Sequence, residues 1–157
     1  MNTFELERRK HFDFFLSYYR KKNWQVIQDN IDSQQKIDWD VKLEIFAGQF
    51  VLVDEKVRGK EFDDLIVEII QDMRTGNLGW FFGPSDWILY GSWVVKESVW
   101  PFSLYLIRLK SLKEYIYGLK GFVKTCISSP EKGWGITWNI VFNWEDLIRK
   151  NIVEKLI

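Results

Sequence analysis

A strict alternation of apolar and polar side chains over residues 37–46 is the feature that most constrains the fold of this chain. Successive side chains of a β-strand point to opposite faces, so the alternation predicts a strand with one buried face and one polar face. The buried face takes Ile37, Trp39, Val41, Leu43 and Ile45, and the polar face takes Asp38, Asp40, Lys42 and Glu44. Ala47 and Gly48 favour a turn, and residues 50–58 are predicted as the second arm of a hairpin.

Apolar periodicity elsewhere predicts further strands and helices. The predicted strands cover residues 24–31, 65–70, 86–93, 103–109 and 136–142, and the segment 65–70 (LIVEII) is apolar enough to lie centrally in a sheet. The predicted helices cover residues 4–22 and 111–119, and a last helix follows an Asn143 cap. This order predicts one α+β domain over residues 1–157, with a mixed central sheet flanked by helices in a three-layer α/β/α-like arrangement.

The composition excludes several kinds of site. Cys126 is the only cysteine and His11 the only histidine, so neither an internal disulfide nor a cysteine- or histidine-rich metal cluster can form. The 22 basic and 22 acidic residues give zero formal net charge, which argues against coating nucleic acid through bulk charge alone. The first ten residues are charged, and no uncharged apolar run approaches the ~20 residues of a membrane span. We therefore expect a soluble cytoplasmic protein without a membrane partner.

The predicted hairpin gathers polar residues that can carry chemistry. Asp54 and Lys56 are two residues apart, so they share one face of their strand. A short hairpin brings Asp40, on the preceding strand, opposite this pair. Glu68, on the next predicted strand, is expected to add a carboxylate at the same level. Asp38 points the same way as Asp40, so either aspartate can be the first acidic group of the site.

Carboxylates on neighbouring strands with a lysine beside them suit a divalent metal site. Carboxylate oxygens are hard ligands for Mg²⁺ or Mn²⁺, and a few of them suffice because water and phosphate oxygens complete the coordination shell. Such a metal acidifies a bound water and neutralises charge on a phosphate under attack. A neighbouring lysine can orient or deprotonate that water.

The sequence resembles the PD-(D/E)XK nucleases, which have the restriction-endonuclease-like fold. The resemblance covers about residues 4–95: a leading helix, Asp40 in IDWDVKL, a turn, Asp54-Glu55-Lys56 in VLVDEKVRG, and Glu68 in LIVEII. It implies divalent-metal-dependent cleavage of phosphodiester bonds. Asp40 and Asp54 would hold the metal with help from the Glu55 carbonyl, Lys56 would serve the nucleophilic water, and Glu68 would be auxiliary.

The resemblance also bears on partners. It implies DNA as the substrate, with RNA not excluded, and a homodimer for members that cut both strands. Arg58 and Lys60 follow the proposed site in sequence, where contacts to substrate phosphates would be needed. The chain departs from the family pattern at Trp39, which stands where a proline often precedes the first aspartate.

Other interpretations of the same residues remain open. The polar face of the hairpin can be a solvated surface with cross-strand ion pairs. The whole fold can be a non-catalytic module that binds nucleic acid or protein. Glu55 lies on the opposite face from Asp54, where a salt bridge to a packing helix is expected. The aromatic residues Trp80, Phe81 and Phe82 can stack on bases, although packing or a dimer contact is the more ordinary use of such residues.

Overall fold

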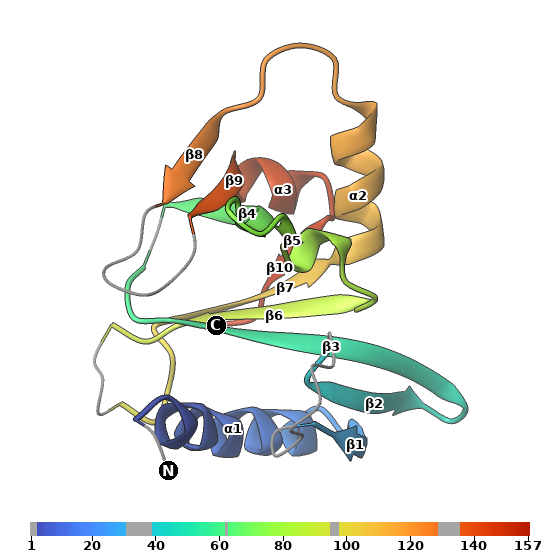
Figure 1. Cartoon of the computed structure of the whole chain (residues 1–157). Helices are drawn as coiled ribbons and strands as arrows, with labels where there is room; N and C mark the ends of the chain where they lie inside the picture. The colour runs from blue at the N-terminus through green and yellow to red at the C-terminus, as the bar shows by residue number, and fades with distance from the viewer. Residues whose placement is uncertain (1–2, 31–38, 62, 95–97, 129–135) are drawn as a thin grey trace.

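The computed structural model describes residues 3–30, 39–61, 63–94, 98–128 and 136–157. Figure 1 shows helix α1 (Thr3–Lys21) on one face of a six-stranded sheet. A four-stranded sheet lies on the other face, together with helices α2 (Leu109–Gly118) and α3 (Trp144–Arg149). The chain is therefore a mixed α+β protein, as the order of the predicted elements indicates. Helices lie on both faces of the six-stranded sheet, as expected, but on the second face they are accompanied by the four-stranded sheet, which was not predicted.

The six-stranded sheet is mixed. Its order is β1 (Gln25–Asp29), β2 (Val41–Phe46), β3 (Gln49–Arg58), β6 (Trp87–Ser92), β7 (Ser103–Arg108) and β10 (Val153–Lys155). Strands β3 and β6 are parallel, and every other neighbouring pair is antiparallel. The predicted hairpin is confirmed: β2 pairs with β3 through a turn in which Gly48 has a φ of 78°. A positive φ of this size is readily adopted by glycine, which has no Cβ.

The four-stranded sheet is antiparallel throughout. Its order is β5 (Asn77–Leu78), β4 (Asp64–Asp72), β9 (Thr137–Asn143) and β8 (Thr125–Ser128). A 3-10 turn, η1 (Trp80–Phe82), follows β5. The predicted strand at 65–70 exists as β4, but it does not extend the sheet of the hairpin. The parallel strand β6 takes the place beside β3, and β4 pairs with β9 instead.

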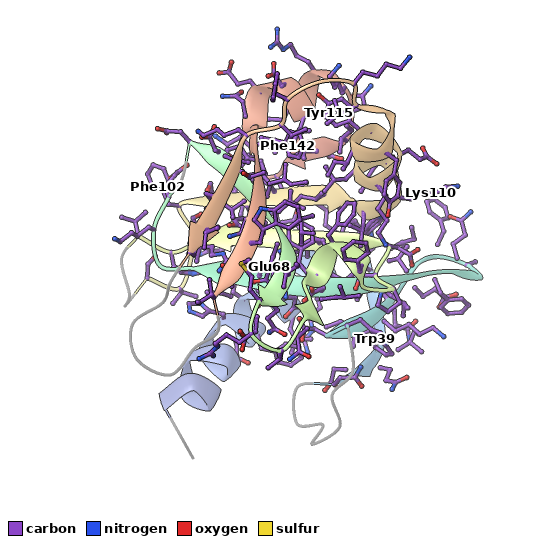
Figure 2. All side chains as sticks on the ribbon, turned by 45° about the horizontal axis from the view of Figure 1, so that its top comes forward. Trp39, Glu68, Phe102, Lys110, Tyr115 and Phe142 are labelled. Carbon is purple, nitrogen blue, oxygen red and sulfur yellow. The ribbon has the colours of Figure 1, made fainter. Side chains whose placement is uncertain are left out.

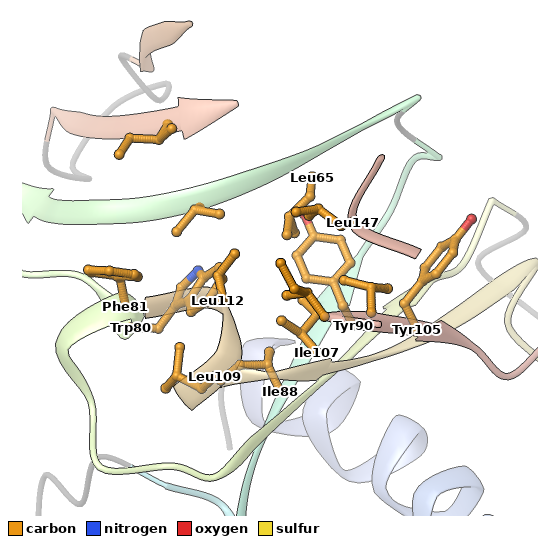
Figure 3. Close-up of a cluster of buried hydrophobic side chains, with 14 of the residues drawn as sticks. Leu65, Trp80, Phe81, Ile88, Tyr90, Tyr105, Ile107, Leu109, Leu112 and Leu147 are labelled. Atoms are coloured by element: carbon orange, nitrogen blue, oxygen red, sulfur yellow. The ribbon is translucent and has the colours of Figure 1, made fainter. Parts of the chain in front are cut away.

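Two apolar cores cover the two faces of the six-stranded sheet. The α1 core lies between α1 and the sheet and consists of Phe14, Phe15, Tyr18, Tyr19, Val41, Leu43, Val53, Leu89, Trp93, Leu104 and Leu106. The inter-sheet core lies on the other face, and Figure 3 shows Leu65 of β4, Ile88 and Tyr90 of β6, Ile107 of β7 and Leu112 of α2 within it. Full burial of an aliphatic side chain such as Leu43 contributes roughly 1.5–3 kcal/mol, so alternation over β2 and β3 is a strong folding constraint.

The short C-terminal helix α3 begins as predicted. The side-chain oxygen of Asn143 accepts hydrogen bonds from the backbone N–H groups of Glu145 (2.9 Å) and Asp146 (3.4 Å). This cap satisfies donors that the first helical turn leaves without an intrahelical partner. No helix within the described ranges is long and apolar enough to cross a membrane.

Candidate functional site

The hairpin places Asp40 beside Asp54. Val41 of β2 pairs with Val53 of β3, and the Asp40 N–H donates to the Val53 carbonyl at 2.9 Å, which continues the pairing by one residue. On the other side, the Asp40 carbonyl accepts a hydrogen bond of 2.8 Å from the Asn30 N–H. The backbone of Asp40 is thus held between two strands, which fixes the start of its side chain. Asp38, the alternative first aspartate, lies outside the described residues.

The Asp40 side chain reaches across the hairpin. Its Oδ2 accepts a hydrogen bond of 2.7 Å from the backbone N–H of Glu55. A hydrogen bond to a carboxylate is stronger than one between neutral groups, so this contact ties the two arms together at the residue that follows Asp54. The fourteen-residue spacing between Asp40 and Asp54 therefore corresponds to direct proximity across β2 and β3.

Asp54 and Lys56 form an ion pair on the face that looks toward the second sheet. The distance between Asp54 Oδ2 and Lys56 Nζ is 2.9 Å. In the parallel register with β6, Asp54 lies beside Ile88 and Lys56 beside Tyr90, and both of these β6 residues belong to the inter-sheet core. Asp54 is only 8% exposed, whereas the Lys56 side chain is 29% exposed. The ion pair therefore lies at the edge of the inter-sheet core, and Lys56 is the more exposed of its two residues.

This environment changes the acidity of Asp54. Burial raises the pKa of Asp54 from 3.8 to about 6, the charge of Lys56 partly opposes the rise, and the neighbouring Asp40 carboxyl adds to it. Two adjacent carboxylates and a desolvated site both disfavour the charged form of the acid. A cation between or beside the two carboxylates would relieve both effects. Perturbed acids of this kind occur often at functional sites, although structural pairs show them as well.

Glu55 points to the opposite face from Asp54 and Lys56. Its Oε1 accepts a hydrogen bond of 2.5 Å from the hydroxyl of Tyr19 on α1. The expected contact with a packing helix exists, as this hydrogen bond from Tyr19 of α1. The Glu55 side chain is consequently directed away from the Asp54 face. Only its backbone belongs to the candidate site, which is also what the nuclease resemblance implies for this residue.

Glu68 is not brought next to Asp54. It lies on β4 of the second sheet, where it pairs with Asn139 of β9. The alternate residues Leu65 and Val67 point into the inter-sheet core, so Glu68 occupies the other face of β4. Figure 2 labels Glu68 on this sheet. The prediction that Glu68 adds a carboxylate at the level of Asp54 is wrong, because β4 pairs in a different sheet.

The carboxylates that do come together are therefore Asp40 and Asp54. Within the part of the chain that the structure describes, no three Asp, Glu, His or Cys side chains form a group that could hold a metal ion. Two carboxylates are nevertheless an adequate protein contribution for Mg²⁺, which keeps several of its waters and is commonly bound through one or two carboxylates and substrate phosphates.

The two predicted phosphate contacts occupy different environments. Arg58 follows Lys56 on the same face of β3, and its Nε donates a 3.0 Å hydrogen bond to the Tyr90 hydroxyl. The guanidinium also lies over the Tyr90 ring, 5.4 Å from its centroid. Lys60 is exposed just beyond the end of β3. Lys56 and Arg58 thus share one face of β3, and Lys60 is the more exposed of the two predicted phosphate contacts.

The aromatic residues after β5 serve mainly as core. Trp80 and Phe81 are 8% and 2% exposed and pack in the inter-sheet core, where Figure 3 labels both. Base stacking by these two side chains is therefore excluded in this conformation. Phe82 is 45% exposed and remains available for contact.

One residue of the site environment was missed by sequence reasoning. Tyr19 belongs to the apolar stripe of the predicted helix, and its role as the donor to Glu55 does not follow from periodicity. A polar contact could have been expected only from the side-chain chemistry, because a buried tyrosine hydroxyl normally has a hydrogen-bond partner.

Comparison of the chain with models of known protein families, with curated proteins and with solved structures gave no match.

Proposed function

We propose that this protein is a divalent-metal-dependent nuclease that hydrolyses phosphodiester bonds in DNA. The observation that carries the proposal is the convergence of Asp40, Asp54 and Lys56 on one face of the β2–β3 hairpin. Glu55 links them, since its N–H donates to Asp40 while its neighbours Asp54 and Lys56 form the ion pair.

Asp40 and Asp54 fit a small hard cation such as Mg²⁺ or Mn²⁺. Both supply carboxylate oxygens, and burial raises the pKa of Asp54 although Lys56 lies beside it, so a bound cation would further stabilise its charged form. The Glu55 carbonyl would be a third oxygen donor, by resemblance to the PD-(D/E)XK nucleases. When bound, the metal would lower the pKa of a water and neutralise charge on the phosphate.

Lys56 has two roles in the proposed site. Its ammonium stabilises the Asp54 carboxylate across 2.9 Å, which keeps the acid ready to accept a cation. A lysine at this place can also orient the attacking water or stabilise negative charge that develops on the phosphate. The basic residues Arg58 and Lys60 would contact backbone phosphates, which positions a substrate without reading its sequence.

The finer fold assignment, restriction-endonuclease-like, is part of the same proposal. It is supported by a leading helix on one face of a mixed sheet and by the aspartate and Asp-x-Lys residues on adjacent arms of a hairpin. The second sheet, where a helical layer was expected, is a departure from the arrangement that the resemblance implies.

Binding of Mn²⁺ by the purified protein tests the proposed ligands. Calorimetric titration of the wild type should give saturable binding that Asp40→Asn and Asp54→Asn each remove. Asp72→Asn, at a carboxylate of the second sheet that is paired with Arg74, is a suitable control and should leave binding unchanged. Equal binding by the wild type and the Asp54→Asn variant would remove the metal site from the proposal.

A second candidate function is a non-catalytic module of the same fold that binds nucleic acid or protein. The specific observation in its favour is exposed aromatic surface, since Trp100 and Phe102 are 57% and 66% exposed. Exposed aromatic residues are typical of contact surfaces. This candidate predicts binding that is independent of metal and unaffected by Asp54→Asn.

A further inference from the structure

Tyr19 reaches the candidate site from the far side of the sheet. Its side chain is fully buried in the α1 core, with its ring centroid 6.3 Å from both Phe15 and Trp24. The ring is thus held by packing, and its hydroxyl has a fixed position relative to β3. A hydroxyl in such an environment needs a hydrogen-bond partner, and Glu55 provides one.

Glu55 joins this helix contact to the site. It stands between Asp54 and Lys56, so alternation along β3 directs its side chain to α1 and theirs to the opposite face. Its Oε1 accepts from Tyr19 Oη at 2.5 Å, and its backbone N–H donates to Asp40 Oδ2 at 2.7 Å. Two hydrogen bonds on one residue therefore connect the buried tyrosine to the Asp40 carboxylate.

The Tyr19 hydroxyl is the donor in its hydrogen bond with Glu55. Burial raises the pKa of Tyr19 well above 10.0, and the negative charge of Glu55 raises it further. Both effects favour the protonated hydroxyl, which donates to the Glu55 carboxylate.

We propose that Tyr19 is a positioning residue for the Asp40–Asp54–Lys56 site, because it clamps Glu55 and thereby fixes the peptide that binds Asp40. This inference rests on the proposed function for its catalytic consequence. Its structural part, the coupling of Tyr19 to the Glu55 amide, stands independently of what the site does. Groups that orient metal ligands from behind typically influence metal affinity or activity by about 10–100-fold.

Tyr18 and Tyr19 form a matched pair for mutagenesis. Tyr19→Phe removes the hydroxyl that contacts Glu55 and preserves the ring. Tyr18→Phe makes the same chemical change at the adjacent residue of α1, which is 6% exposed and whose hydroxyl is buried without a hydrogen-bond partner among the described residues. Any effect of Tyr19→Phe that Tyr18→Phe does not share therefore reports on the contact with Glu55.

The first readout is structural and requires no catalysis. Hydrogen exchange of the Glu55 amide, measured by NMR, should become about tenfold faster in Tyr19→Phe. It should be unchanged in Tyr18→Phe, and the Leu106 amide of β7 should exchange equally in all three proteins. Unchanged exchange at Glu55 in the Tyr19→Phe variant would overturn the coupling even if the protein proves to be a nuclease.

The second readout is functional. Tyr19→Phe should weaken Mn²⁺ binding and lower kcat by about tenfold, with KM for DNA unchanged, since the tyrosine lies behind the site. Glu55→Leu removes the acceptor of the Tyr19 hydroxyl and should therefore behave like Tyr19→Phe. Equal activity of Tyr19→Phe and Tyr18→Phe would overturn the positioning role. If the wild type neither binds Mn²⁺ nor cleaves, the proposed function fails, and the exchange experiment still decides the coupling.

Discussion

The ammonium of Lys56 lies 2.9 Å from the carboxylate of Asp54, two residues away on the same strand. Ion pairs at the protein surface contribute little because water screens them, but Asp54 is 8% exposed and its charge depends on this neighbour. Asp40, held across the hairpin, brings a second carboxyl to the same place. Lys56 and Asp40 thus act in opposite directions on the acidity of Asp54.

Removing the Lys56 charge should make Asp54 a weaker acid. In Lys56→Met the partner that opposes the rise in pKa is lost, so the pKa of Asp54 should rise above about 6. The measurement is an NMR titration of the Asp54 side-chain carboxyl. Lys60→Met, at an exposed lysine beyond the end of β3, is the control and should leave the titration unchanged. A lower pKa in Lys56→Met would contradict the described ion pair.

Asp54 should reduce stability at neutral pH. Its pKa is raised on folding from 3.8 to about 6, so the native state favours the protonated acid. Stability from this group is therefore fully present below about pH 4 and is lost as the pH rises through about 6. The loss is roughly 2–3 kcal/mol, since one pKa unit corresponds to about 1.4 kcal/mol.

Asp54→Asn tests this linkage, because asparagine resembles the protonated acid. The variant should be more stable than the wild type at pH 7.5, by up to roughly 2–3 kcal/mol, and no more stable at pH 4. Urea denaturation at both values measures the difference. Asp72 should show the opposite sign: its hydrogen bonds from Arg74 lower its pKa, so Asp72→Asn should lose stability at neutral pH. A destabilised Asp54→Asn at pH 7.5 would show that the carboxylate form is favoured in the fold.

Glu68 should be dispensable for cleavage. It lies on the second sheet and is not adjacent to Asp54, so Glu68→Gln should retain the wild-type rate within about twofold, whereas Asp40→Asn should lose more than about 100-fold. Initial rates at saturating Mg²⁺ compare the two variants. Loss of activity in Glu68→Gln with an unchanged melting temperature would require Glu68 to act on the substrate from the second sheet.

Gly79 should be required for packing against β4. A Cβ at Gly79 would lie 2.2 Å from the Glu68 carbonyl oxygen, and a backbone atom cannot easily move away. Gly79→Ala should therefore destabilise the protein by about 1–3 kcal/mol. Gly118→Ala, where nothing lies within 4 Å of the added atom, is the control and should cost much less. Thermal denaturation of the two variants measures the difference.

Much of the fold could be predicted because alternation reports directly on burial. Val41, Leu43 and Val53 occupy the α1 core, and Asp54 lies on the other face, as the pattern in residues 37–58 indicates. The same pattern cannot identify strand partners. The segment containing Glu68 forms a strand as predicted, but its pairing with β9 depends on residues more than seventy positions away, such as Asn139.

The shortest strands could not be predicted from apolar periodicity either. Strand β5 has two residues and β10 has three, which is too few for a repeating pattern. Strand β8 (Thr125–Ser128) was not among the predicted strands, and it lies at the edge of the second sheet beside β9. In each case the structure depends on pairing with a distant strand and not on a local preference of the segment.

Some residues of the candidate site could be predicted from the sequence, and Tyr19 could not. Residues close in sequence, such as Asp54 and Lys56, could be assigned to one face by counting, and the hairpin turn added Asp40. Tyr19 is separated from Glu55 by 36 positions and belongs to an apolar stripe, so its polar contact required the packing of α1 on the sheet.

Cleavage of DNA by the wild type and by Lys56→Ala, purified identically, would decide whether this protein is a metal-dependent nuclease that uses Lys56. Supercoiled, linear and single-stranded DNA, with RNA as a further substrate, would be incubated in Mg²⁺, Mn²⁺ or EDTA. We expect the wild type to cleave DNA in Mg²⁺ or Mn²⁺ and not in EDTA, and we expect no cleavage by Lys56→Ala in any buffer. Equal cleavage by both proteins would contradict this expectation, and so would the absence of cleavage of every substrate by the folded wild type.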